Sequence, residues 1–129
     1  MPHIVLEGSV DLKKFYAGYK PASRQTGGEV LKLQNIFINP DSDTVLIEAL
    51  AVEDGPPNRF FVQAGTRGGK TTVRIYPGTD PEKTPGIKKL MAMVAKDIKD
   101  HQPGVTYGAT NLKEFLDEVI SECENRNEE

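Results

Sequence analysis

The feature that constrains this chain most is a glycine-rich turn between two strand-forming runs, in residues 59–76. The segment reads RFFVQAGTRGGKTTVRIY, with the apolar run FFV before the turn and TTVRIY after it. β-Branched and aromatic residues on both sides of a glycine cluster are typical of a β-hairpin. The sequence therefore predicts an antiparallel pair of strands here, to which the rest of the fold is added.

The same segment is the charge exception of the chain. It carries Arg59, Arg67, Lys70 and Arg74 and no acidic residue, so it contributes +4 to a net charge of −3 and the remaining residues sum to −7. Arginine suits bidentate binding of carboxylates, so the hairpin predicts a small anionic ligand or an acidic partner. The alternative is an exposed, charged hairpin whose cations only prevent edge-to-edge pairing.

Composition limits the class of protein. A length of 129 residues suits one domain. An acidic pI of about 5.4 argues against general nucleic-acid binding, because such binding needs a basic surface. The single cysteine, Cys123, argues against disulfides, so a reducing compartment, the cytoplasm, is predicted. No apolar run has the length of a membrane span and no basic-then-apolar leader opens the chain, so no membrane partner is expected.

Three more segments have strand character. Residues 2–7 (PHIVLE) contain a continuous apolar run, and residues 44–52 are almost wholly apolar, which predicts a central strand. In residues 31–38 the apolar alternation changes phase, and a β-bulge near Gln34-Asn35 restores it. Residues 20–28 (KPASRQTGG) have the composition of a surface loop.

Helical periods occupy the rest of the chain. Thr84 and Pro85 predict the start of a helix that runs to about Lys99, because Thr is a good N-cap and Pro is favoured in the first turn. A last helix is predicted after Thr110 or Asn111, a short one after Ser9, and a short strand at 105–107.

These elements predict an α+β fold: a two-layer sandwich in which helices pack on one face of a mixed sheet. We expect a single domain over residues 1–123, followed by an acidic, disordered tail over residues 124–129.

The glycine-rich turn also fits a relaxed phosphate-loop pattern, with Ala64 in place of the first glycine. Such a loop binds phosphate because a helix N-terminus follows it. Here VRIY and then Pro77-Gly78 follow, which predicts a strand. A hairpin turn is therefore the better interpretation.

Pro2 is the first candidate catalytic residue. Met1 is commonly trimmed from a Met-Pro start, which would leave a secondary amine at the beginning of a buried strand. An α-amino group titrates near about 7.7–8.0, and desolvation or neighbouring arginines would lower that pKa toward neutrality, making Pro2 a general base. The alternative is that Pro2 only starts a strand, where its missing N–H costs little.

Residues 1–7 (MPHIVLE) resemble the opening of 5-carboxymethyl-2-hydroxymuconate isomerases, members of the tautomerase superfamily. Residues 52–58, followed by Phe61-Val62, are loosely similar to a segment of the same family, and the strand at Arg74-Ile75 before a helix has a counterpart there. The resemblance implies a β-α-β based fold, a trimer, and Pro2 moving a proton on an acidic keto or dienol substrate. Arg59, Arg67 and Arg74 are then the candidate substrate-binding residues.

His3, His101 and Cys123 show no metal-ligand spacing, so neither a metal nor another cofactor is expected. Two functional hypotheses follow from the sequence. The first is a small tautomerase-type isomerase that uses Pro2, or a degenerate relative of one. The second is a non-catalytic binding or assembly module whose cationic hairpin binds an anionic ligand or an acidic protein.

Overall fold

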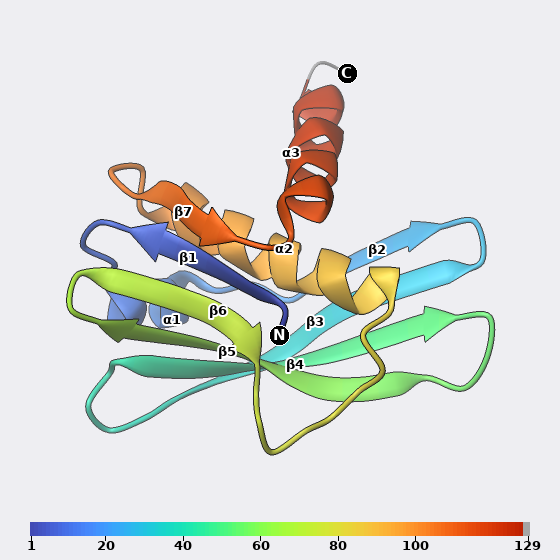
Figure 1. Ribbon diagram of the computed structural model, residues 1–129, viewed down its shortest axis with the longest axis horizontal. Helices are drawn as coiled ribbons and strands as arrows, with labels where there is room; N and C mark the ends of the chain where they lie inside the picture. The colour runs from blue at the N-terminus through green and yellow to red at the C-terminus, as the bar shows by residue number, and fades with distance from the viewer. Residues whose placement is uncertain (128–129) are drawn as a thin grey trace.

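The computed structural model describes the backbone of residues 1–127 and the side chains of residues 1–122 (Figure 1). This part of the chain forms seven strands and three helices. In chain order they are β1 (His3–Glu7), α1 (Leu12–Gly18), β2 (Ala22–Thr26), β3 (Glu29–Ile38), β4 (Thr44–Glu53), β5 (Asn58–Arg67), β6 (Lys70–Ile75), α2 (Pro85–His101), β7 (Thr106–Thr110) and α3 (Lys113–Asn127).

The strands form one sheet in the order β2-β3-β4-β5-β6-β1-β7. Every described pair of neighbours is antiparallel. The α+β class is confirmed, but the predicted mixed sheet is wrong. The physical reason is that short turns join β2 to β6 in succession, and a short turn returns the chain antiparallel to the strand it left.

The hairpin predicted in residues 59–76 is confirmed. Its register runs from Val62 opposite Ile75 to Arg67 opposite Lys70. Gly68 and Gly69 form the turn with φ of 60° and 77°, which is the left-handed backbone that a two-residue hairpin turn of this kind requires.

The predicted bulge in β3 is also confirmed, because the register with β4 shifts between Leu33 and Ile36. The shift places Leu33 opposite Ala49 and Ile36 opposite Ile47, so the apolar residues before and after it face the same side. The Tyr19 hydroxyl donates to the Gln34 carbonyl in the bulge at 2.8 Å. Burial raises the pKa of Tyr19, which keeps this donor protonated.

Two local predictions need correction. Residues 22–26, expected to lie in a loop, form strand β2, which pairs with β3 from Ala22 opposite Leu33 to Thr26 opposite Glu29. The polar sequence ASRQT gives no strand signal of its own, so pairing with β3 decides its conformation. Helix α1 is capped by Asp11 and not by Ser9: the Asp11 carboxylate accepts from the Lys14 N–H at 3.1 Å.

Helix α2 begins as predicted. The Thr84 hydroxyl accepts from the Ile87 N–H at 3.3 Å, and Pro85 occupies the first turn. Glu53, the last residue of β4, accepts from the Gly86 N–H at 2.7 Å. A Cβ at Gly86 would lie 2.5 Å from that carboxylate, so glycine is needed for β4 to bind the start of α2 this closely.

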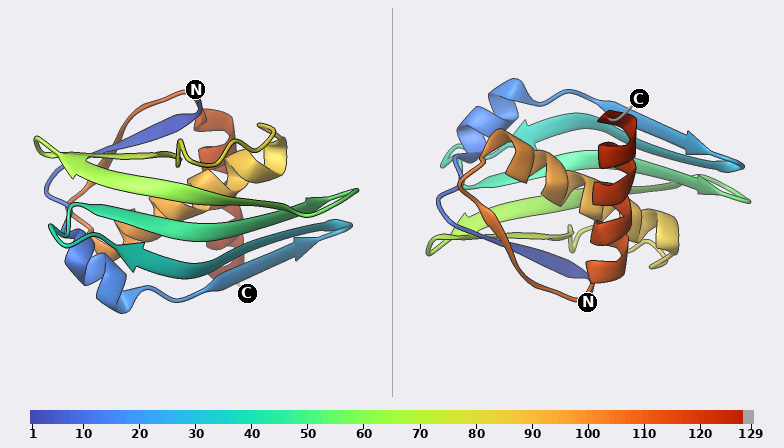
Figure 2. Two further views of the ribbon diagram at one scale, coloured as in Figure 1. Left: turned by 90° about the horizontal axis from the view of Figure 1, so that it is seen from below. Right: turned by 90° about the horizontal axis from the view of Figure 1, so that it is seen from above.

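The sheet curls around α2, which lies along its concave side, and α3 crosses over α2 (Figure 1, Figure 2). We call the side of the sheet that faces α2 the inner face. The core consists of inner-face side chains from the strands and the apolar stripe of α2, with Leu12 and Phe15 of α1, Leu112 just before α3, and Leu116 and Val119 of α3. Helix α3 includes residues 124–127 of the predicted tail, while residues 128 and 129 and the Cys123 side chain lie outside the described part.

Candidate functional site

The predicted arginines project from the outer face of the sheet, the face turned away from α2. In β5 the buried residues Phe60, Val62 and Ala64 face inward, so Arg59 and Arg67 alternate to the outer face. In β6 the buried Val73 and Ile75 face inward and Arg74 faces outward. The four cations predicted from the hairpin, including Lys70, are all exposed.

Arg67 and Arg74 come together in one open hollow of about 630 Å³. The other residues that line it are Asp43, Thr44, Gln63, Gly65, Thr66 and Thr72. Arg59 instead lines a smaller hollow with Glu48 and Phe61. Of the predicted substrate-binding residues, the structure thus brings together two.

The arginines of the outer face differ in their partners. With the Gln63 amide oriented so that its oxygen faces Arg74, that oxygen accepts from Nε at 3.2 Å and from Nη2 at 3.1 Å. Within residues 1–122, no hydrogen bond or ion pair reaches the guanidinium group of Arg59 or of Arg67. Hydrogen bonds from Asn39 and Thr44 hold the pKa of Asp43 below its ordinary value, so this acid stays ionised at the edge of the Arg67–Arg74 hollow.

An aromatic row crosses the same face. Phe61 contacts Phe37 edge-on at a centroid distance of 6.3 Å and Tyr76 edge-on at 6.4 Å. Phe37 is 50% exposed. Sequence reasoning did not identify this row. A signal for it exists: β3, β4 and β5 carry apolar residues on both faces of the sheet, while the helices cover only the inner face.

Pro2 and the arginines line different hollows, although His3, the residue after Pro2, pairs with Arg74. Pro2 lines a hollow of about 250 Å³ with Met1, Ile75, Pro77, Thr79, Asp80 and Lys83, whereas Arg74 lines the outer-face hollow. The backbone around it is held by Asn111: the Asn111 Nδ2 donates to the Met1 carbonyl at 2.7 Å, and the His3 N–H donates to Asn111 Oδ1 at 3.0 Å. The N-terminus is therefore fixed to the junction of β7 and α3.

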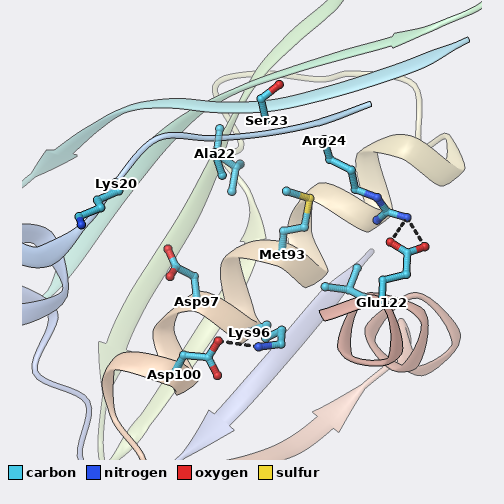
Figure 3. A pocket seen from close by; sticks show the side chains of 11 residues that line it. Lys20, Ala22, Ser23, Arg24, Met93, Lys96, Asp97, Asp100 and Glu122 are labelled. Atoms are coloured by element: carbon cyan, nitrogen blue, oxygen red, sulfur yellow. Dashed lines mark hydrogen bonds and ion pairs between the residues drawn. The ribbon is translucent and has the colours of Figure 1, made fainter. Parts of the chain in front are cut away.

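A further cavity, the inner pocket, lies between β2, β3, α2 and α3 (Figure 3). Its volume is about 230 Å³, and its lining residues are Lys20, Ala22, Ser23, Arg24, Leu33, Met93, Lys96, Asp97, Asp100, Val119 and Glu122. Arg24 is only 7% exposed and forms an ion pair with Glu122 of α3. Sequence reasoning missed this site, because β2 was expected to be a loop and Glu122 follows Arg24 by 98 residues.

Two other observations concern the described residues only. They contain no group of three or more His, Cys, Asp or Glu side chains that would hold a metal ion. Among the helices described, none has the length and apolar character needed to cross a membrane.

Comparison of the chain with protein-family models, with curated proteins and with solved structures finds no match. The resemblance of residues 1–7 to tautomerases therefore stays a prediction.

Proposed function

We propose that this protein is a binding module whose outer sheet face docks an acidic partner protein. The observation that carries the proposal is the aromatic row Phe37-Phe61-Tyr76 on the same face as Arg59 and Arg67, two cations without a partner in the described residues. In this proposal the molecule is a two-layer sandwich with helices on one face only, and the partner covers the other face.

The composition of the outer face supports a protein partner. The solvated face of an antiparallel sheet is normally polar, yet β4 places Leu46, Leu50 and Val52 there, all of them partly exposed. Aromatic residues and arginine are the types enriched in interface centres. Arginines without an internal partner add electrostatic complementarity toward an acidic surface and speed association with it.

A small anion fits this face less well. The Arg67–Arg74 hollow is open, and two nitrogens of Arg74 already donate to Gln63. Ionised Asp43 also lines the hollow and repels a second carboxylate or phosphate placed there. A protein surface, by contrast, would contact the aromatic row as well as the cations.

Site-specific photo-crosslinking in the native cell tests the proposal. We would introduce p-benzoylphenylalanine in place of Phe37 or, as a matched control, in place of Tyr16 of α1, a ring of similar exposure (50% and 40%) away from the outer face. We expect a discrete protein adduct at position 37 and none at position 16. Equal adducts at both positions would contradict a specific docking face.

Charge reversal then separates electrostatic docking from simple hydrophobic contact. Arg59→Glu with Arg67→Glu should abolish the adduct at position 37, and raising the salt concentration should weaken it, because exposed charges are screened. Lys113→Glu on α3, also an exposed cation, is the control and should leave the adduct unchanged. An adduct that survives the double reversal, or that an added small anion such as citrate removes completely, would count against an acidic protein partner.

The tautomerase hypothesis also remains a prediction, together with the trimer and the cytoplasmic location. The observation in its favour is that Pro2 shares a hollow with a cation, Lys83, which there pairs with Asp80 at 2.6 Å. In that mechanism Lys83 would bind the substrate carboxylate, since Arg67 and Arg74 line a different hollow. Mass spectrometry of the native protein tests it: a chain that keeps Met1 has no free Pro2 amine. Full activity of Pro2→Ala on a dienol acid would equally contradict it.

A further inference from the structure

The inner pocket has two charged ends and an apolar middle. At one end Arg24 pairs with Glu122, and at the other lie Asp97 and Asp100 of α2 (Figure 3). Between them, Leu33, Met93 and Val119 supply the apolar lining. The cavity of about 230 Å³ has the volume that about eight waters occupy in the liquid. It is therefore sized for a small organic molecule.

Most charges around the pocket are already matched. Arg24 contacts Glu122, and Lys96 Nζ lies 2.5 Å from Asp100 Oδ2. The lining contains three cations, Lys20, Arg24 and Lys96, and the same number of acids, Asp97, Asp100 and Glu122. Asp97 is the acid among them whose carboxylate accepts no hydrogen bond within residues 1–122, although it forms an ion pair with His101.

The nearest cation does not supply that hydrogen bond. His101 Nδ1 lies 3.4 Å from Asp97 Oδ1, but it lies 2.9 Å from the Asp97 backbone carbonyl, which is the better acceptor for its N–H. The Asp97 side chain is two-thirds buried, and burial raises the pKa of its carboxyl. Burial has removed part of the water around this carboxylate, and a donor placed in the pocket would replace it.

We propose that the inner pocket is a binding site for a small apolar amine, whose ammonium donates to Asp97 while its carbon chain packs on Leu33, Met93 and Val119. The ammonium supplies the missing charge-assisted hydrogen bond, and the chain displaces water from apolar walls. This site is separate from the outer face, so its test does not depend on the proposed protein docking.

Titration of the wild-type protein with three probes that share one branched alkyl chain provides the test. The probes are 3-methylbutylamine, the uncharged 3-methylbutan-1-ol, and leucine, which adds a carboxylate that the lining residue Lys20 would bind. We would follow the Met93 methyl and the amides of residues 93–100 by NMR. We expect saturable shifts with the amine, a dissociation constant on the order of millimolar, and binding of the alcohol weaker by at least about tenfold.

Affinity should also depend on chain length, because each methylene buried in the pocket should tighten binding about fourfold from ethylamine upward. If leucine binds more tightly than the amine, and this gain in affinity is lost in Lys20→Ala, the natural ligand is an amino acid bound through Asp97. Equal binding of amine and alcohol would overturn the proposal, as would the absence of a saturable shift.

Two variants separate the role of Asp97 from folding. Asp97→Asn should lower amine affinity at least about tenfold, and its melting temperature shows that the variant is still folded. Asp117→Asn on α3, an exposed acid paired with Lys113 at 3.2 Å, is the control and should change neither quantity. Amine affinity unchanged in Asp97→Asn would overturn the assignment.

Discussion

The two faces of the sheet hold arginine in opposite ways. On the inner face Arg24 is buried and contacts Glu122, whereas on the outer face Arg67 is exposed and has no partner in the described residues. A buried guanidinium must be paired, because water no longer solvates it, while an exposed one needs no partner to be stable. The inner arginine thus forms a contact that stabilises the fold, and the outer one remains available to bind another molecule.

The Arg24–Glu122 pair should give the largest effect. Glu122→Ala removes the carboxylate that pairs with Arg24, whose side chain is only 7% exposed. We expect the unfolding free energy to fall by about 2–3 kcal/mol. This loss is smaller than the full cost of breaking a buried pair, because Glu122 is itself 37% exposed. Glu118→Ala, one turn earlier on α3, is the matched control. Glu118 is 42% exposed and lies 3.7 Å from Lys89, so its removal should cost less than about 0.5 kcal/mol. Equal losses in urea denaturation would mean that the burial of Arg24 does not raise the cost of removing its partner.

A second variant sharpens the same point. Replacing both partners, Arg24→Met with Glu122→Leu, removes the charges and keeps apolar volume. Such replacements are often neutral or stabilising, so stability should recover to within about 1 kcal/mol of wild type. A double variant as unstable as Glu122→Ala would mean that packing, and not the unpaired charge, explains the loss.

The contact between α2 and α1 gives a smaller, pH-dependent effect. Both His101 ring nitrogens face backbone carbonyls, of Asp97 at 2.9 Å and of Gly18 at 3.3 Å, and these contacts raise the pKa of His101 above its ordinary value of 6.5. Because the folded pKa is the higher one, the stabilisation is complete below pH 6.5 and disappears as pH rises through the folded pKa.

Thermal denaturation of wild type and His101→Gln at several pH values measures this contribution. The difference in melting temperature should be on the order of 2–3 °C in mild acid and should shrink as the pH is raised above neutrality. A difference that stays constant or grows with pH would contradict a protonated His101 between the two helices.

The smallest effect on stability belongs to the outer face. Arg67→Ala and Arg59→Ala remove exposed cations without partners in the described residues, so the unfolding free energy should change by less than about 0.5 kcal/mol. The same variants should weaken capture of the partner in the crosslinking experiment. Stability that falls by more than about 1 kcal/mol would show that these arginines belong to the fold.

Local sequence signals predicted the elements whose stabilising contacts are near in the chain. The hairpin of residues 59–76, the bulge at Gln34-Asn35 and the Thr84 cap depend on turn chemistry, alternation or a bond three residues away. Elements without such signals were missed: β2 has no apolar alternation and becomes a strand through its pairing with β3. The predicted mixed sheet was wrong for a related reason, since no local signal specifies where β1 pairs.

The candidate sites divide in the same way. The cationic character of residues 59–76 is a property of the sequence alone, and strand alternation places those cations on one face. Whether they meet Pro2 depends on the pairing of β1 with β6, which sets His3 opposite Arg74, and on strand alternation, which leaves Pro2 and Arg74 in different hollows. The inner pocket depends on contacts across 98 residues, from Arg24 to Glu122. Local propensity carries no information about such distant contacts, so only the tertiary structure decided which charges are buried, which are paired and which face is left open.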